Sequence, residues 1–129
     1  MEHVFISLDQ LNATANQVIH HKENNLDKKD NINELPDQQA VYAICGRVNG
    51  QLANCRFVGA TDNLQKSVRS HFEGGIDDAC VDTFFSSIKT KMIVYKVLQD
   101  SSNEELEALK KSWTEMLNPV CNEELNEVF

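Results

Sequence analysis

Basic residues are scarce in this sequence. Its 129 residues include 12 lysines and arginines against 20 aspartates and glutamates, which gives a formal net charge of −8. The charge is uneven: residues 1–38 carry −4, residues 39–100 carry +1 and residues 101–129 carry −5. A protein that neutralises many phosphates normally presents a basic face. The composition therefore argues against tight non-specific binding to nucleic acid and leaves room only for a small local site.

Long apolar runs are also missing. No stretch of the sequence approaches the ~20 consecutive apolar residues that a membrane-spanning helix needs. The first ten residues, MEHVFISLDQ, lack the basic start and the apolar run of a signal peptide. We therefore expect a soluble, cytoplasmic protein without a membrane partner.

Cysteine pairs with a recognisable spacing are absent as well. The four cysteines are Cys45, Cys55, Cys80 and Cys121, and they include no C-x-x-C pair and no common zinc-site spacing. We expect them to be reduced and mostly buried, as is usual in a reducing compartment. A redox or disulfide role is the alternative.

The length fits one domain of ordinary size. Residues 1–38 read as an N-terminal extension or linker, in which a short strand and a helix precede a polar loop that contains Pro36. We expect the folded domain to span residues 39–122. Residues 123–129 are expected to form a solvated acidic tail.

Two short apolar segments, 40–45 and 52–59, predict the strands of a β-hairpin. Asn49-Gly50 lies between them, and this dipeptide favours a type I′ turn, which needs positive φ at both central residues. If these two residues form the turn, the numbers of opposite residues sum to 99.

This register makes specific predictions about the faces of the hairpin. It places Tyr42 opposite Phe57 and Ile44 opposite Cys55, with all four side chains on one face. Cys45 falls on the other face, so the register predicts no disulfide between Cys45 and Cys55. A loop longer by one residue would bring these two cysteines opposite each other.

The period of the pattern changes after the hairpin. Leu64, Val68 and Phe72 recur every four residues and predict a buried helical face, with Thr61 or Asp62 as the cap. The pattern next predicts a strand over 90–98 and a helix over 101–117 that begins with a capping box and buries Trp113. The order of these elements, a hairpin, a helix, a strand and a helix, predicts an α+β fold. We expect a small, mainly antiparallel three-stranded sheet flanked by helices.

Three short motifs occur in a recognisable order: Ala40-Val41-Tyr42, then Phe57-Val58-Gly59, then NPVCN over residues 118–122. Together they resemble the GIY-YIG endonuclease domain, which has Gly-Ile-Tyr, Tyr-Ile-Gly and a closing Pro-x-x-Asn at these places. The resemblance covers residues 39–122. Within the family, the sequence is similar to a diverged branch, the stand-alone cyanobacterial GIY-YIG proteins and the N-terminal domain of plastid monothiol glutaredoxins. The Cys-Gly-Phe-Ser motif of a glutaredoxin domain is absent.

The resemblance implies metal-assisted hydrolysis of a phosphodiester bond and supplies the candidate site. The family uses motif tyrosines to activate water and an arginine on the first helix to stabilise phosphate charge. Tyr42 matches the first tyrosine, whereas Phe57 occupies the second position without a hydroxyl. Ser67 stands at the arginine position, and His71 and Asn122 match other positions of the site.

The metal-binding glutamate of the family is replaced too. Counting back from Pro119, its position falls near Lys110, whose charge has the wrong sign for a metal ligand. Glu107 lies one helical turn earlier and is the candidate metal ligand. Arg69 lies about 200° around the helix from Ser67 and is expected to point away. We expect no cofactor, or Mg²⁺ or Mn²⁺ if the chain is active.

These replacements predict a degenerate GIY-YIG domain that is catalytically impaired and acts as a binding or scaffold module. A protein is the expected partner, and DNA binding is expected to be weak. The alternative is a weak or substrate-restricted, metal-dependent DNA endonuclease that uses Tyr42, His71, Glu107 and Asn122. A thiol redox module is the third reading.

Overall fold

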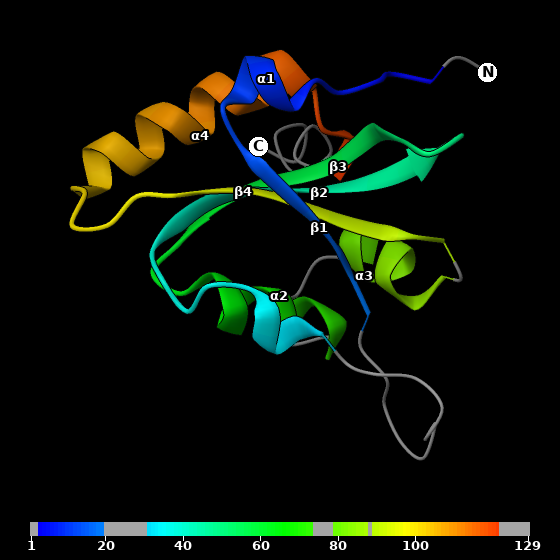
Figure 1. Cartoon of the computed structure of the whole chain (residues 1–129), viewed down its shortest axis with the longest axis horizontal. Helices are drawn as coiled ribbons and strands as arrows, with labels where there is room; N and C mark the ends of the chain where they lie inside the picture. The colour runs from blue at the N-terminus through cyan, green and yellow to red at the C-terminus, as the bar shows by residue number, and fades with distance from the viewer. Residues whose placement is uncertain (1–2, 20–30, 74–78, 88, 122–129) are drawn as a thin grey trace.

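The computed structural model describes residues 3–19, 31–73, 79–87 and 89–121. The elements follow in the order α1 (Leu8–Leu11), β1 (Thr14–Val18), η1 (Ile32–Glu34), β2 (Ala40–Val48), β3 (Gln51–Thr61), α2 (Leu64–Phe72), α3 (Ala79–Ser86), β4 (Lys91–Val97) and α4 (Asn103–Leu117), with η1 a 3₁₀ turn. Figure 1 shows the sheet between α1 and α4 on one side and α2 and α3 on the other.

The four strands form one antiparallel sheet in the order β1-β4-β2-β3. The predicted α+β class is confirmed, but the prediction of three strands is wrong. The fourth strand is β1, which pairs with β4 from Thr14↔Tyr95 to Val18↔Lys91. Part of the segment 1–38 therefore belongs to the sheet, although the sequence suggested an extension.

The N-terminal segment also has its elements in the opposite order to the one expected, because α1 comes before β1. Asn12 ends α1 in the left-handed conformation, with φ 51°, which asparagine tolerates better than most residues. Leu11 and Val18 are buried on opposite sides of the sheet. The segment thus contributes to both layers of the core.

The Asn49-Gly50 turn forms as predicted. Both residues have positive φ, 51° and 79°, and Val48 pairs with Gln51 across the turn. This is the geometry that a two-residue type I′ hairpin requires.

Beyond the turn, a bulge changes the predicted register. Between the pairs Gly46↔Ala53 and Ile44↔Phe57, one residue of β2 stands against three of β3. Asn54, one of those three, has φ 58°, a conformation that bulges often need and that asparagine accepts. Tyr42 consequently lies opposite Gly59, not Phe57.

The bulge also changes the face of one cysteine. Cys55 packs in the same cluster as Cys45, although the predicted register placed them on opposite faces. Both are buried free thiols, although the register on which the prediction of no disulfide rested does not form. Tyr42, Ile44 and Phe57 still share one face, because the pairing shifts by two residues.

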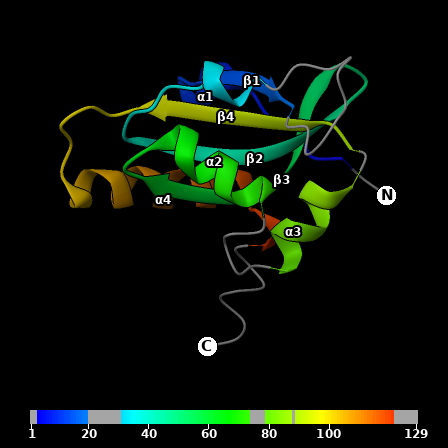
Figure 2. The same cartoon turned by 90° about the horizontal axis from the view of Figure 1, so that it is seen from below.

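The sheet separates two apolar layers, and Figure 2 looks at it from the side on which α2 and α3 lie. In one layer α4 packs against the sheet through Leu106, Trp113 and Leu117. In the other layer α2 and α3 pack against the side that carries Tyr42 and Ile44. The predicted core position of Trp113 is confirmed, since this side chain is only 1% exposed.

Of the two helix caps that the sequence predicts, one is confirmed and the other is wrong. Ser102 and Glu105 form the predicted capping box at the start of α4. Asn63, not Thr61 or Asp62, caps α2 by accepting a hydrogen bond from the Lys66 amide. Within α2, Leu64 and Val68 are fully buried, as their spacing predicts.

A disulfide joins Cys80 of α3 to Cys121, just after α4. The expectation of four reduced cysteines is therefore wrong for this pair. Their Cα atoms lie 5.5 Å apart, although the cysteines are 41 residues apart in the sequence. Only the packing of α3 beside the segment that follows α4 brings them together, and the spacing along the chain does not reveal it.

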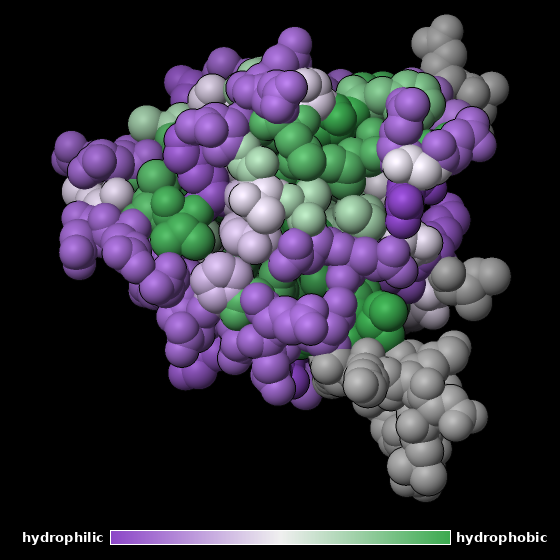
Figure 3. Space-filling view, in the orientation of Figure 1, coloured by the Kyte–Doolittle hydropathy of each residue, from purple (hydrophilic) through white to green (hydrophobic). Residues whose placement is uncertain are grey.

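Hydrophilic side chains cover much of the face seen in Figure 3, and apolar ones gather in patches below α1. None of the helices in the described ranges has the length and apolar content that crossing a bilayer requires.

Candidate functional site

Tyr42 and His71 form a buried pair at the place where the sequence predicts a site. Tyr42 is the third residue of β2, and His71 lies in the last turn of α2. A hydrogen bond joins Tyr42 Oη to His71 Nε2 across 2.9 Å. The two side chains are only 3% and 1% exposed. The strand and the helix are thus linked through the interior by a polar contact.

Aromatic rings enclose this pair. Phe57 lies 6.1 Å from the Tyr42 ring and 5.5 Å from the His71 ring, measured between centroids. Phe85 of α3 stacks on His71 at 5.5 Å with an interplanar angle of 7°. Offset and edge-to-face arrangements at these separations are favourable packing geometries. The hydroxyl and the imidazole therefore sit in an apolar layer and not in an open cleft.

This environment decides what the Tyr42 hydroxyl can do. Burial raises the pKa of Tyr42 well above its ordinary value of 10.0, because the phenolate would lose its hydration. The hydroxyl stays protonated at neutral pH, and a buried neutral phenol cannot take a proton from water bound outside the core. The Tyr42 hydroxyl is thus enclosed in the core, with His71 as its hydrogen-bond partner.

Two further side chains of α2, Ser67 and Arg69, form hydrogen bonds to neighbouring elements. Ser67 Oγ lies 2.5 Å from Thr61 Oγ1, so it links the start of α2 to the end of β3. Arg69 donates a hydrogen bond to Oδ1 of Asn33, the central residue of η1, at 2.6 Å. Its guanidinium is held at η1, away from the buried pair, as its position on the helix predicts.

Glu107 lies in the other layer of the molecule. It is exposed on α4, which packs against the sheet face opposite to that of Tyr42 and His71. Lys110 is partly exposed on the same helix. No three His, Cys, Asp or Glu side chains among the described residues are grouped so that they could hold a metal ion.

The structure thus brings together only part of the predicted site. Tyr42, Phe57 and His71 are in mutual contact. Ser67 lies one turn earlier on α2 and contacts Thr61 instead. Glu107 is on the other side of the sheet, and Asn122 lies outside the described residues.

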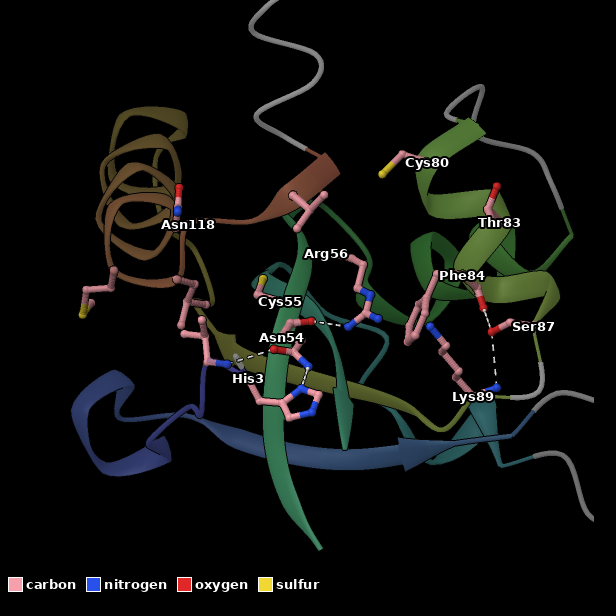
Figure 4. Close-up of a pocket in the computed structure, with 14 residues that line it drawn as sticks. His3, Asn54, Cys55, Arg56, Cys80, Thr83, Phe84, Ser87, Lys89 and Asn118 are labelled. Carbon is pink, nitrogen blue, oxygen red and sulfur yellow. Dashed lines mark hydrogen bonds between the residues drawn. The ribbon is translucent and has the colours of Figure 1, made fainter. Parts of the chain in front are cut away.

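A second feature, a cavity of about 610 Å³, has no counterpart in the sequence analysis (Figure 4). It lies between the β3 bulge, α3 and the end of α4, and Arg56, Lys89 and His3 are among the residues that line it. Arg56 comes from the unpredicted bulge, and His3 from a segment expected to be an extension. No motif marks these residues, which is why sequence reasoning missed the cavity.

Comparison with known proteins assigns no family to this chain. No family model matches the sequence, and no curated protein matches it.

Substituting Tyr42 with Phe tests the structural role of the pair. The Tyr42→Phe variant leaves His71 Nε2 without this hydrogen bond in an apolar layer. We expect the free energy of unfolding at pH 7 to fall by about 1–3 kcal/mol, as measured by urea denaturation. An unchanged free energy would show that the contact contributes nothing to stability.

The pH dependence of stability gives a second readout of the same substitution. Above about pH 10 the unfolded chain releases the Tyr42 proton, whereas the folded chain keeps it, because burial raises the Tyr42 pKa. Wild-type stability should therefore fall as pH rises above this value, by up to about 1.4 kcal/mol per pH unit from this group. The fall should be shallower in Tyr42→Phe. Parallel profiles would contradict the burial of the hydroxyl.

Proposed function

We propose that this chain is a diverged GIY-YIG-like domain that acts as a binding module and does not cleave nucleic acid. The family resemblance is supported by the order of elements: a hairpin, a helix that packs on it, a strand and a long helix. Tyr42 and Phe57 also share the face on which the family keeps its paired tyrosines. The observation that carries the proposal is the burial of Tyr42 Oη against His71.

The residues present do not fit the chemistry of the family. Its divalent metal would need a carboxylate near the tyrosine, but Glu107 is on the opposite face of the sheet. The family's second tyrosine hydroxyl is absent at Phe57, and the anion-stabilising guanidinium is absent at Ser67. Losing one such charge stabiliser typically costs a barrier increase of about 2.7–4 kcal/mol. The proposed function therefore includes no hydrolytic step.

Charge disfavours nucleic acid as the main ligand. The formal net charge is −8, and the C-terminal 29 residues alone carry −5. Phosphate contacts dominate the affinity of proteins for nucleic acid. A binding module with this charge is better suited to a ligand or a protein partner than to a DNA backbone.

A nuclease assay tests the loss of catalysis. We expect wild-type protein with Mg²⁺ or Mn²⁺ to cut plasmid and branched DNA no faster than the Tyr42→Phe variant purified in parallel. The physical reason is that Tyr42 is buried, while the second tyrosine hydroxyl, the guanidinium and the nearby metal ligand of the family are missing. Cutting that is present in the wild type and abolished in a folded Tyr42→Phe variant would contradict the proposal and support a metal-dependent endonuclease.

The disulfide favours a second candidate function, thiol redox exchange. Cys80 is partly exposed and Cys121 is buried, and the two form the bond observed between α3 and the end of the described chain. Disulfides in cytosolic proteins are usually transient and redox-sensing. In the forward step, two thiols lose two protons and two electrons to glutathione disulfide, which becomes two molecules of glutathione.

Equilibration with glutathione buffers tests this second function. We expect denatured, alkylated protein to show two modified cysteines under oxidising ratios and four under reducing ratios, as counted by mass. Cys45 and Cys55 act as internal controls, because both are free thiols in the folded protein. A bond that persists at every glutathione ratio would be structural only, and four modified cysteines at every ratio would exclude the bond.

A further inference from the structure

The cavity between the β3 bulge, α3 and α4 has a positively charged side. Arg56 and Lys89 lie toward α3 in Figure 4, and His3 lies beside the bulge. No aspartate or glutamate occurs among the described residues that line the cavity. This concentration of positive charge stands out in a chain whose formal net charge is −8.

Arg56 is the most firmly placed of these groups. Its guanidinium lies 4.4 Å from the centroid of the Phe84 ring, and its Nη1 donates to the Asn54 carbonyl at 2.5 Å. Gly46 leaves space for it, because a Cβ there would lie 3.2 Å from Arg56 Nη1. Partial burial lowers the pKa of Arg56. The Phe84 ring and the Asn54 carbonyl thus hold the guanidinium in place. None of the described residues that line the cavity supplies a carboxylate to neutralise it.

A further lysine strengthens the positive potential on this side. Lys91 is only 9% exposed, and its Nζ lies 5.8 Å from the centroid of the same Phe84 ring. The Lys91 ammonium donates to the Ser87 carbonyl. Placing several cations around a partly buried site without a counter-charge is unfavourable. An anion bound there would remove this cost.

The other side of the cavity is apolar and open. Val4, Met116 and Val120 line it and are 59%, 50% and 54% exposed. Leu117, a member of the core, also lines the cavity. Asn118 marks this side in Figure 4, across β3 from Arg56 and Lys89. Exposed apolar side chains gathered around one cavity are typical of a binding site.

We propose that this cavity binds a small amphipathic organic anion. Its carboxylate or phosphate group meets Arg56 and Lys89, and its apolar chain lies along Met116 and Val120. Guanidinium groups bind both carboxylate and phosphate through paired hydrogen bonds. A volume of about 610 Å³ is in the ordinary range for small-molecule sites. The inference names a ligand for the binding module proposed above and in that sense rests on it.

Calorimetric titration of the full chain with octanoate and with octyl phosphate tests the site. Both anions should bind, and the tighter one identifies the preferred head group. Octanol and acetate serve as controls, because octanol has the apolar chain without the charge and acetate has the charge without the long apolar chain. We expect both controls to bind at least tenfold more weakly than the tighter anion.

Two variants at exposed positions test the two halves of the cavity separately. Lys89→Gln removes a charge on the α3 side, and Met116→Glu places a carboxylate on the apolar side; both positions are exposed, so the fold should tolerate them. We expect octanoate affinity to fall at least threefold and tenfold, respectively. Lys66→Gln is the matched control on α2, an exposed lysine that does not line the cavity, and it should leave the affinity unchanged.

Equal affinities for octanoate and octanol would overturn the proposal, as would unchanged affinity in both cavity variants. No heat of binding for either anion at millimolar concentration would overturn it as well. These results are independent of the nuclease assay. DNA cleavage would refute the non-catalytic function without affecting octanoate binding, and failed octanoate binding would leave the loss of catalysis intact.

Discussion

The hydrogen bond between Tyr42 and His71 is the constraint on which the candidate site depends. It joins β2 to α2 inside an apolar layer, and it is tolerated there because the Tyr42 hydroxyl and His71 Nε2 satisfy each other. Gly59 stands opposite Tyr42 for a steric reason. A Cβ at that position would lie 2.8 Å from the Phe57 ring and 3.0 Å from the Tyr42 ring. The packing that holds the tyrosine in place also keeps water away from it.

Local features of the fold could be predicted from the sequence, because neighbouring residues determine them. Asn49-Gly50 predicted its turn through the φ angles that the turn demands, and Ser102 with Glu105 predicted the start of α4. The shared face of Tyr42 and Phe57 also followed from strand alternation. The candidate site was thus partly predictable: its aromatic members lie together, but their enclosure by Phe85 of α3 depends on how the helices pack.

Features that depend on distant segments could not be predicted. The Asn54 bulge is held by the N-terminal segment, since Asn54 Oδ1 accepts a hydrogen bond from the Val4 amide at 2.9 Å. The Cys80–Cys121 bond and the placement of Glu107 on the far side of the sheet both follow from how the helices pack. The cavity around Arg56 is a product of the same bulge. Composition alone suggested no cationic site in so acidic a chain.

The exchange of the proton shared by Tyr42 Oη and His71 Nε2 is the most direct measure of whether this pair is closed to solvent. That proton can be followed in the ¹H spectrum of protein labelled with ¹⁵N in histidine, where it correlates with His71 Nε2 directly if it is on the nitrogen, or across the hydrogen bond if it is on the Tyr42 oxygen. A buried pair gives a resolved, slowly exchanging resonance that correlates with His71 and does not shift when Mg²⁺ and duplex DNA are added. A proton lost to rapid exchange with water, or a resonance that moves on adding Mg²⁺ and DNA, would contradict a purely structural role for Tyr42.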